Sequence, residues 1–147
     1  MEKRNKTSRI KILTAVLVAV LAFIWGNSLL PGEQSAEVSN GLSDFIARIF
    51  GITAEDLGII IRKAAHFTEY AVLGAVVYLL LKSKGKKEKE LVLYSAVCML
   101  LFPLIDETIQ LIIPQRNGAV LDIWIDISGY VVGSLITRLL IKPKKTE

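Results

Sequence analysis

The sequence has few of the residue types and motifs that mark the commonest catalytic sites. Its 147 residues include one histidine, one cysteine and two tryptophans. The single Cys98 excludes a disulfide within the chain and a zinc site built on paired cysteines. A glycine-rich phosphate loop and a nucleophile elbow are also absent. The motifs of P-loop nucleotide binding, α/β-hydrolase catalysis and zinc fingers are therefore excluded.

What the sequence does have is apolar residues in long runs. Hydrophobic residues make up 52% of the chain, and the mean hydropathy is +0.50. This composition is too apolar for an ordinary soluble domain of this size, and it indicates an integral membrane protein. The formal net charge is +4, but the cations gather at the two ends of the chain and in one central loop. Such clusters are a topology signal, so we expect no nucleic acid as a partner.

Four apolar runs are each close to the ~20 residues that a transmembrane helix needs. They cover about residues 10–30, 62–81, 91–113 and 121–141. None of them shows the period-2 alternation of a barrel strand. The sequence therefore predicts an all-α fold, a single domain over residues 1–147 that forms an integral membrane bundle of four transmembrane helices.

The positive charges orient these spans. Lysines and arginines precede the first span, fill the loop between the second and third, and close the chain: Lys3, Arg4, Lys6, Arg9, Lys11, Lys82, Lys84, Lys86, Lys87, Lys89, Arg138, Lys142, Lys144 and Lys145. The loops after the first and third spans carry far fewer cations. The positive-inside rule then predicts a multi-pass protein with both termini in the cytoplasm.

The first span has an alternative interpretation, a cleaved signal peptide, because a basic arm precedes the apolar residues 12–24. The run continues to Leu30, and no small-x-small cleavage site follows at the usual distance. A retained span is therefore favoured. Cleavage would leave the orientation of the other three spans unchanged.

The loop between the first two spans has a helical pattern of its own. Polar residues fill one side of this pattern. The apolar residues, which recur at steps of three and four, are Val38, Leu42, Phe45, Ile46, Ile49 and Phe50. The pattern predicts an external amphipathic helix, either a lid over the mouth of the bundle or a helix that only packs against it.

Ionisable side chains inside the spans are the strongest functional signal. Each costs about 2.5–3.5 kcal/mol in hydrocarbon, so such groups indicate a functional site. Arg62, His66 and Glu69 share one face of the second span. The other polar residues of the spans are Lys63 in the second, Asp106, Glu107 and Gln110 in the third, and Asp122 and Asp126 in the fourth. The predicted orientation puts them all near the external surface, so we expect an outward-facing polar pocket.

These residue types allow three kinds of chemistry. His66 can exchange a proton near neutral pH, with Glu69, Asp106 or Glu107 as further catalytic candidates. A phosphate or carboxylate can be held by cations, with the amide and acids as further ligand-binding candidates: Arg62, Lys63, Gln110, Arg116, Asp122 and Asp126. The acids and His66 together can bind a divalent cation, although their spacing is not diagnostic of one. The structural alternative is ion pairing, such as Lys63 with Asp122 or Asp106 with Arg116.

Close packing should turn the acids of the fourth span inward. Gly129 and Gly133 follow Asp122 and Asp126 on the same side, and a Gly-x-x-x-Gly pair permits close approach of another helix. The acidic face is therefore expected to point into the bundle and not toward lipid.

The chain resembles the VanZ-like family of small bacterial membrane proteins, named after a protein associated with teicoplanin resistance. The resemblance lies in Lys63-x-x-His66-Phe67-x-Glu69-Tyr70, then Asp106-Glu107-x-x-Gln110, then Arg116 before Asp122 and Gly129. Asp126 departs from the family pattern, in which an Asn is common. The resemblance implies a bacterial plasma membrane protein with a role in the cell envelope or in glycopeptide resistance.

Three functions stay open at this stage, and the enzymatic status with them. The first is binding of an outer-leaflet lipid-linked cell-wall precursor, or of the glycopeptide itself. The second is a hydrolase or transferase that acts on a phospho-lipid headgroup. The third is a proton- or ion-coupled transporter, which is disfavoured because the ionisable residues gather in the outer half of the spans and not at the midplane.

Overall fold

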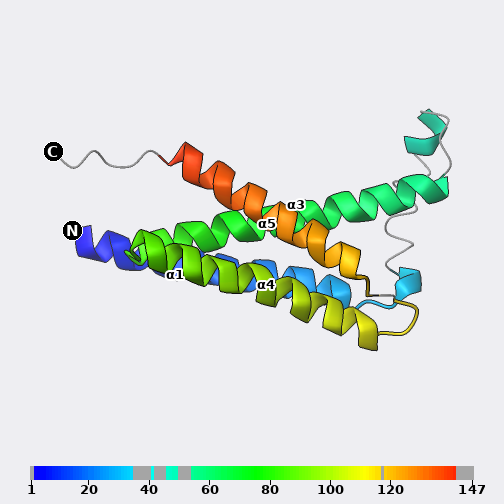
Figure 1. The fold of residues 1–147 in the computed structure, drawn as a ribbon, viewed down its shortest axis with the longest axis horizontal. Helices are drawn as coiled ribbons and strands as arrows, with labels where there is room; N and C mark the ends of the chain where they lie inside the picture. Colours follow the sequence, from blue (N-terminus) through cyan, green and yellow to red (C-terminus); the bar gives the residue numbers. More distant parts are fainter. Residues whose placement is uncertain (1, 35–40, 42–45, 50–53, 117, 142–147) are drawn as a thin grey trace.

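The computed structural model describes residues 2–34, 41, 46–49, 54–116 and 118–141, and its long elements are all helices. They are α1 (Glu2–Ser28), α3 (Ala54–Ser83), α4 (Glu88–Ile112) and α5 (Val120–Leu140) (Figure 1). Each of the four is long and apolar enough to cross a membrane. The all-α membrane bundle predicted from the sequence is confirmed. Most of the predicted amphipathic helix, residues 37–50, lies outside the described residues.

The helices extend beyond the apolar runs that predicted them. α1 begins at Glu2 and α3 at Ala54, well before the expected residues 10 and 62. An apolar run marks only the part of a helix that lies in hydrocarbon. The helix itself continues through polar residues until its backbone hydrogen bonds end. α1 ends at Ser28, slightly earlier than expected, just before Pro31, and α4 ends at Ile112 just before Pro114. Proline cannot continue a helical hydrogen-bond ladder and also constrains the residue before it.

The start of α1 and the end of α5 lie at the same end of the bundle (Figure 1). The turn between α3 and α4 lies there too, and Gly85 adopts a φ of 77° in it, a conformation that favours glycine. The α4–α5 turn lies at the opposite end. Among the described residues, the start of α1, the α3–α4 turn and the end of α5 therefore share one end of the bundle, as the even number of spans requires.

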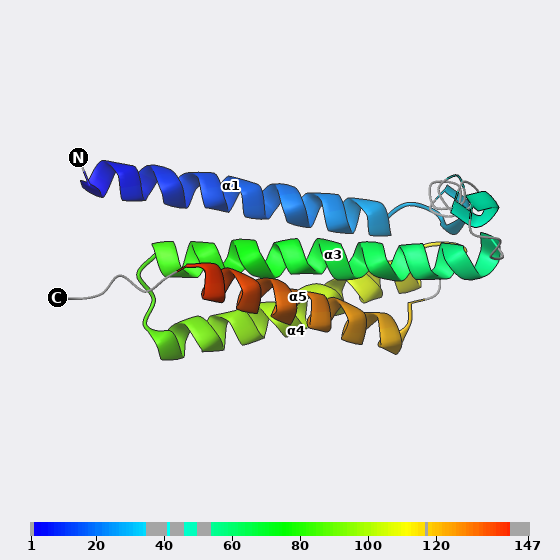
Figure 2. The same cartoon turned by 90° about the horizontal axis from the view of Figure 1, so that it is seen from above.

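α3 is the central helix. It crosses α5 near the middle of the bundle (Figure 1), and α1 runs alongside it on the other side (Figure 2). A Cβ on Gly129 would overlap the carbonyl oxygen of Phe67, and one on Gly133 would overlap that of Ala71. These two glycines let the backbones of α3 and α5 touch, which confirms the predicted role of the Gly-x-x-x-Gly pair.

A small core fills the space around this crossing, and it draws on α1, α3 and α5. Its buried members are Ile24, Tyr70, Leu73, Val77 and Tyr130. Trp25 of α1 and Phe102 of α4 add an edge-to-face contact, with ring centroids 6.1 Å apart. Many other apolar side chains of the helices are exposed in the isolated chain. Exposed apolar residues along helices of this length suit contact with lipid tails.

The chain that follows α1 contacts the α4–α5 turn. The Gly32 amide donates a hydrogen bond to the Pro114 carbonyl, at 3.3 Å. A Cβ on Gly32 would overlap the carbonyl oxygen of Gln115. Gln115 adopts a φ of 59° and donates from its side chain to Glu33, at 2.8 Å. These contacts bring α1, α4 and α5 together at the end of the bundle opposite to the termini.

Candidate functional site

Each of the four long helices contributes a side chain to one buried polar layer. Its members are Ser28 of α1, His66 of α3, Asp106 and Gln110 of α4, and Asp126 of α5. Asp106 and Asp126 lie within two turns of the α4–α5 turn, as the sequence predicts. His66 lies deeper along its own helix than expected, because α3 begins earlier. The polar layer therefore lies inside the bundle, within about two helical turns of the α4–α5 turn.

Asp106 is held by two neutral donors. The Ser28 hydroxyl donates to Asp106 Oδ1 at 2.5 Å, and the Gln110 amide donates to Oδ2 at 3.3 Å. The Gln110 amide also lies 3.3 Å from the Ser28 hydroxyl oxygen. All three side chains are buried. These hydrogen bonds fix the orientation of the Asp106 carboxylate.

Asp126 has no such support. It is 0% exposed, its Oδ2 makes no hydrogen bond with another residue of the described chain, and its Oδ1 has only the imidazole of His66 beside it. Its nearest charged partner is His66, whose Nδ1 lies 3.3 Å from Asp126 Oδ1 and 4.0 Å from Asp106 Oδ2. The imidazole thus lies between two buried carboxylates. Unsupported buried carboxylates are costly, so they point to a role other than packing.

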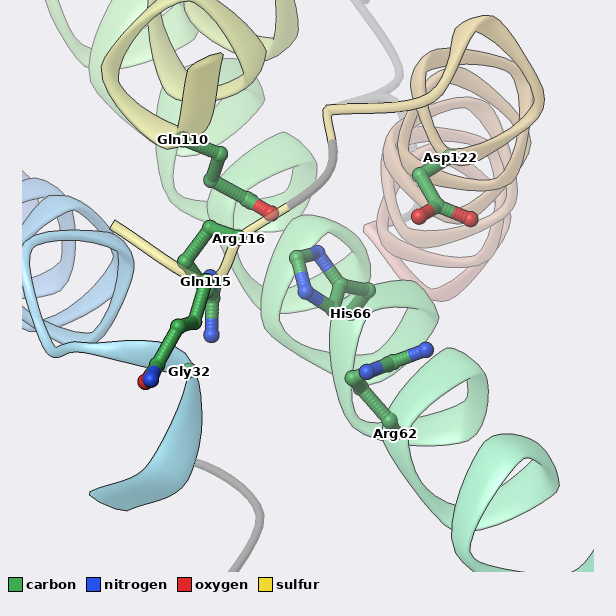
Figure 3. A pocket seen from close by; sticks show the side chains of 7 residues that line it. All are labelled: Gly32, Arg62, His66, Gln110, Gln115, Arg116 and Asp122. Carbon is green, nitrogen blue, oxygen red and sulfur yellow. The ribbon is translucent and has the colours of Figure 1, made fainter. Parts of the chain in front are cut away.

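A pocket of about 120 Å³ lies beside His66 and is large enough for several water molecules. Figure 3 shows the side chains around it, which come from α3, α4, α5, the segment after α1 and the α4–α5 turn. The lining residues are Gly32, Arg62, His66, Gln110, Gln115, Arg116 and Asp122. His66 and Gln110 belong to both the pocket and the polar layer, so they connect the two.

The pocket brings two arginines together. Burial, and then the charge of Arg62, lower the pKa of Arg116 below its ordinary value. Arginine nevertheless remains cationic in proteins. Two guanidinium groups at one pocket form a surface suited to a phosphate or carboxylate, because each offers several N–H donors in a planar fork.

Two of the predicted site residues form an ion pair beside the pocket. Lys63 Nζ lies 4.0 Å from Asp122 Oδ1, and both side chains are partly exposed. This is the pair that the sequence suggested as a structural alternative. A partly exposed pair of this length contributes little to stability, so its main effect is to set the charge at the rim of the pocket.

The remaining predicted acids, Glu107 and Glu69, have hydrogen-bond partners of their own. The buried Glu107 accepts a hydrogen bond from the Ala119 backbone amide, at 2.8 Å, at the start of α5. Glu69 accepts a hydrogen bond from Asn27 of α1, at 3.4 Å. The sequence suggested Glu69 or Asp106 as the acid beside His66; Asp106 Oδ2 lies 4.0 Å from His66 Nδ1, and Asp126 Oδ1 lies closer, at 3.3 Å. Helical spacing puts His66 and Glu69 on one side of α3, whereas the neighbouring helices decide which atoms meet.

Sequence reasoning missed the part that α1 and the turns play. Asn27 and Ser28 end the first span, and Gly32 and Gln115 line the pocket. One signal was available for the first two, because they are polar residues at the external end of an apolar run. Nothing in the sequence pattern marks Gly32 or Gln115, since their place depends on the contact between two turns.

The comparisons with known proteins agree with the helical architecture. A family model described as VanZ/LLP1 matches residues 13–141. The match takes in part of α1 and the whole of α3, α4 and α5. No curated protein and no solved structure showed significant similarity to the chain. With a family match over most of its length and four helices able to span a bilayer, the chain is a multi-pass membrane protein that belongs to the VanZ/LLP1 family.

Proposed function

We propose that the protein binds the phosphate-bearing headgroup of an outer-leaflet cell-envelope lipid, such as a lipid-linked cell-wall precursor, in the pocket between Arg62 and Arg116. In this proposal both termini face the cytoplasm of a bacterial cell, and the pocket opens to the outside. Holding such a precursor would lower the susceptibility of the cell to glycopeptides of the teicoplanin type.

The distribution of cations supports the orientation. The basic N-terminal arm, the lysine-rich α3–α4 turn and the end of α5 share one end of the bundle (Figure 1). The positive-inside rule assigns such an end to the cytoplasm. The polar layer and its pocket are near the other end, where a lipid of the outer leaflet presents its headgroup.

The presence of both Arg62 and Arg116 in the lining of one pocket is the single observation that carries the proposal. A phosphate offers several acceptor oxygens and negative charge, which two guanidinium groups can bind together. The Gln110 amide lines the same pocket and adds a neutral donor. The carboxylate of Asp122 would repel an anion there, but Lys63 pairs with Asp122 and offsets its negative charge.

An apolar groove supports a lipid ligand over a free anion. It measures about 370 Å³ and lies between α1 and α3, along membrane-spanning segments of both. Its lining is almost wholly apolar except near Glu69 and Thr68: Val16, Ala19, Val20, Phe23, Ile24, Thr68, Glu69 and Val72. Glu69 lies one turn of α3 beyond His66. A hydrocarbon chain in this groove would place its headgroup end toward the pocket.

Binding of a polyprenyl phosphate to the purified protein tests the proposal. We expect saturable binding to the wild type, and a loss of about tenfold or more in affinity for Arg62→Gln and for Arg116→Gln, since a hydrogen bond to a charged group contributes about 1.5–3 kcal/mol. Arg138→Gln is the matched control, because Arg138 pairs with Glu88, at 2.7 Å, at the other end of the bundle. The polyprenol without phosphate should bind weakly. Equal binding of the two lipids would contradict the proposal.

The link to resistance is tested in cells. Wild type and His66→Ala are expressed at matched membrane levels, and teicoplanin susceptibility and extracted lipid-linked precursors are measured. We expect the wild type to lower susceptibility and to change the amounts of these precursors, and His66→Ala to do neither. If the wild type changes neither quantity, the proposed role in resistance is wrong.

A second candidate function is hydrolysis or group transfer at the same headgroup. The observation that favours it is the position of His66 between Asp106 and Asp126, beside the pocket. Such an imidazole can act as a general acid or base on a bound phosphate ester. Phosphate release from a polyprenyl pyrophosphate is the measurement. His66→Ala and Asp106→Asn should abolish the release while the protein still accumulates, whereas no release by the wild type would leave binding as the function.

A further inference from the structure

Three potential metal ligands come together where α3, α4 and α5 meet. His66, Asp106 and Asp126 each offer one atom, and these atoms all lie within 4.8 Å of one another. The two carboxylates are fully buried. A cluster of this kind could be a set of ion pairs or a cation site, and the surroundings of its members distinguish the two.

The charges of the cluster do not balance by ion pairing alone. Two carboxylates face a single imidazole, so with both carboxylates ionised the three groups keep a net negative charge even when His66 carries a proton. A divalent cation bound by two carboxylates and a neutral imidazole gives a neutral site. Since uncompensated buried charge is costly, the cation is the better match to the side chains present.

Asp126 provides an independent observation. Both of its oxygens are buried; Oδ2 makes no hydrogen bond within the described chain, and Oδ1 has only His66 beside it, with Nδ1 at 3.3 Å. In a tetrahedral site with metal–ligand distances of 2.0–2.1 Å, neighbouring ligand atoms lie about 3.3–3.4 Å apart. The distance from His66 Nδ1 to Asp106 Oδ2 is 4.0 Å, and all three ligand atoms lie within 4.8 Å of one another, so the side chains would have to move closer together around a bound ion.

We infer that His66, Asp106 and Asp126 form a binding site for a divalent metal ion of the zinc class. One nitrogen and two oxygen donors suit Zn²⁺, whereas Mg²⁺ and Ca²⁺ prefer oxygen ligands alone. Three protein ligands leave a fourth position open, as in zinc sites that bind a water or a substrate. Because His66 also lines the pocket, that position is close to the pocket.

The neighbours of Asp106 fit the role of outer-shell groups. Metal-bound carboxylates are commonly held by further hydrogen bonds, which fix their orientation. Ser28 and Gln110 donate to the two oxygens of Asp106 and leave each oxygen a further lone pair. The metal site does not depend on the proposed lipid ligand, so it can be tested with the metal alone.

The test is Zn²⁺ binding to the purified, chelator-stripped protein in detergent, measured by titration calorimetry and by metal analysis after desalting. The chain has one histidine and one cysteine, so an affinity tag without histidine keeps competing donors few. We expect one Zn²⁺ per chain, and little competition from Mg²⁺ or Ca²⁺. Asp126→Asn and His66→Gln should each weaken binding by about 100-fold or more, and Ser28→Ala by about 10–100-fold.

Glu90→Gln is the matched control, because Glu90 lies on the same helix as Asp106 but near the start of α4, where it pairs with Lys86. Its binding should equal that of the wild type. If Asp126→Asn fails to fold, His66→Gln decides the question, since it keeps both carboxylates. The inference is overturned if the wild type does not bind Zn²⁺, or if a folded Asp126→Asn or His66→Gln binds it as well as the wild type.

Discussion

The middle of the bundle and its polar layer use buried side chains in different ways. In the middle, where α3 crosses α5, Leu73 and Val77 are packed among apolar neighbours, and glycines let the two backbones touch. In the polar layer, two carboxylates are buried with a single imidazole, and one of them, Asp126, has no partner in the described chain other than that imidazole. Close apolar packing supports folding, whereas unsupported buried charge opposes it. The difference indicates that the middle is the scaffold and that the polar layer is kept for function.

The largest effect is expected where the scaffold is tightest. Gly133→Leu would force a side chain into the Ala71 carbonyl and push α5 away from α3, at a cost of about 3 kcal/mol, the upper end for overpacking. The measurement is reversible unfolding in mixed detergent with Trp fluorescence, for which Trp25 against Phe102 is a packing reporter. Gly26→Leu is the control, because no atom lies within 4 Å of a Cβ there. Equal losses in the two variants would refute the close contact.

The next effect is expected at Glu107, an acid near the polar layer that holds the start of α5 in place. Glu107 accepts the Ala119 amide, so Glu107→Ala leaves that amide without its acceptor and should cost about 1–3 kcal/mol. Glu90 accepts the Lys87 amide at the exposed start of the same helix, at 3.2 Å, so Glu90→Ala should cost less. Both are measured by the same unfolding experiment. A smaller loss for Glu107→Ala than for Glu90→Ala would contradict a supporting role for Glu107.

The two core tyrosines should differ by a smaller amount. The Tyr130 hydroxyl lies 3.2 Å from the Ser95 hydroxyl, so Tyr130→Phe should cost about 0.5–1.5 kcal/mol. The Tyr70 hydroxyl is buried without a hydrogen bond in the described chain, so Tyr70→Phe should leave stability unchanged or raise it. Unfolding free energies of the two variants test this contrast. A greater loss for Tyr70→Phe would show that its hydroxyl has a stabilising partner.

The smallest effect is expected at the rim of the pocket. Lys63 and Asp122 are partly exposed and 4.0 Å apart, and their coupling energy should lie between about 0 and 1 kcal/mol. A double-mutant cycle of Lys63→Ala and Asp122→Ala measures it. A coupling energy well above this range would make the pair part of the scaffold.

The sequence could predict the four transmembrane helices and the depth of their polar residues, but not which of these residues contact one another. Long apolar runs define transmembrane helices by themselves, and charge flanking them orients each one. Helical spacing and orientation together then put Asp106 and Asp126 at a shared depth. Which carboxylate approaches His66 depends on how the helices rotate against one another, and that is set by contacts such as Gly129 with Phe67.

Other parts of the site depend on contacts that no periodicity encodes. Ser28 reaches Asp106 from a helix far away in the sequence. Gln115 enters the pocket because its turn meets Gly32. The early start of α3 was also missed, because hydropathy marks the apolar part of a helix and not its first hydrogen bond.

The most direct test of the central claim is the unfolding free energy of Asp126→Asn in metal-free protein. If the polar layer is kept for function, removing one carboxylate leaves His66 and Asp106 as a balanced pair. The variant should then be at least as stable as the wild type. If Asp126 instead holds the bundle together through its ion pair with His66, the variant should lose about 3–5 kcal/mol, and that result would contradict the account.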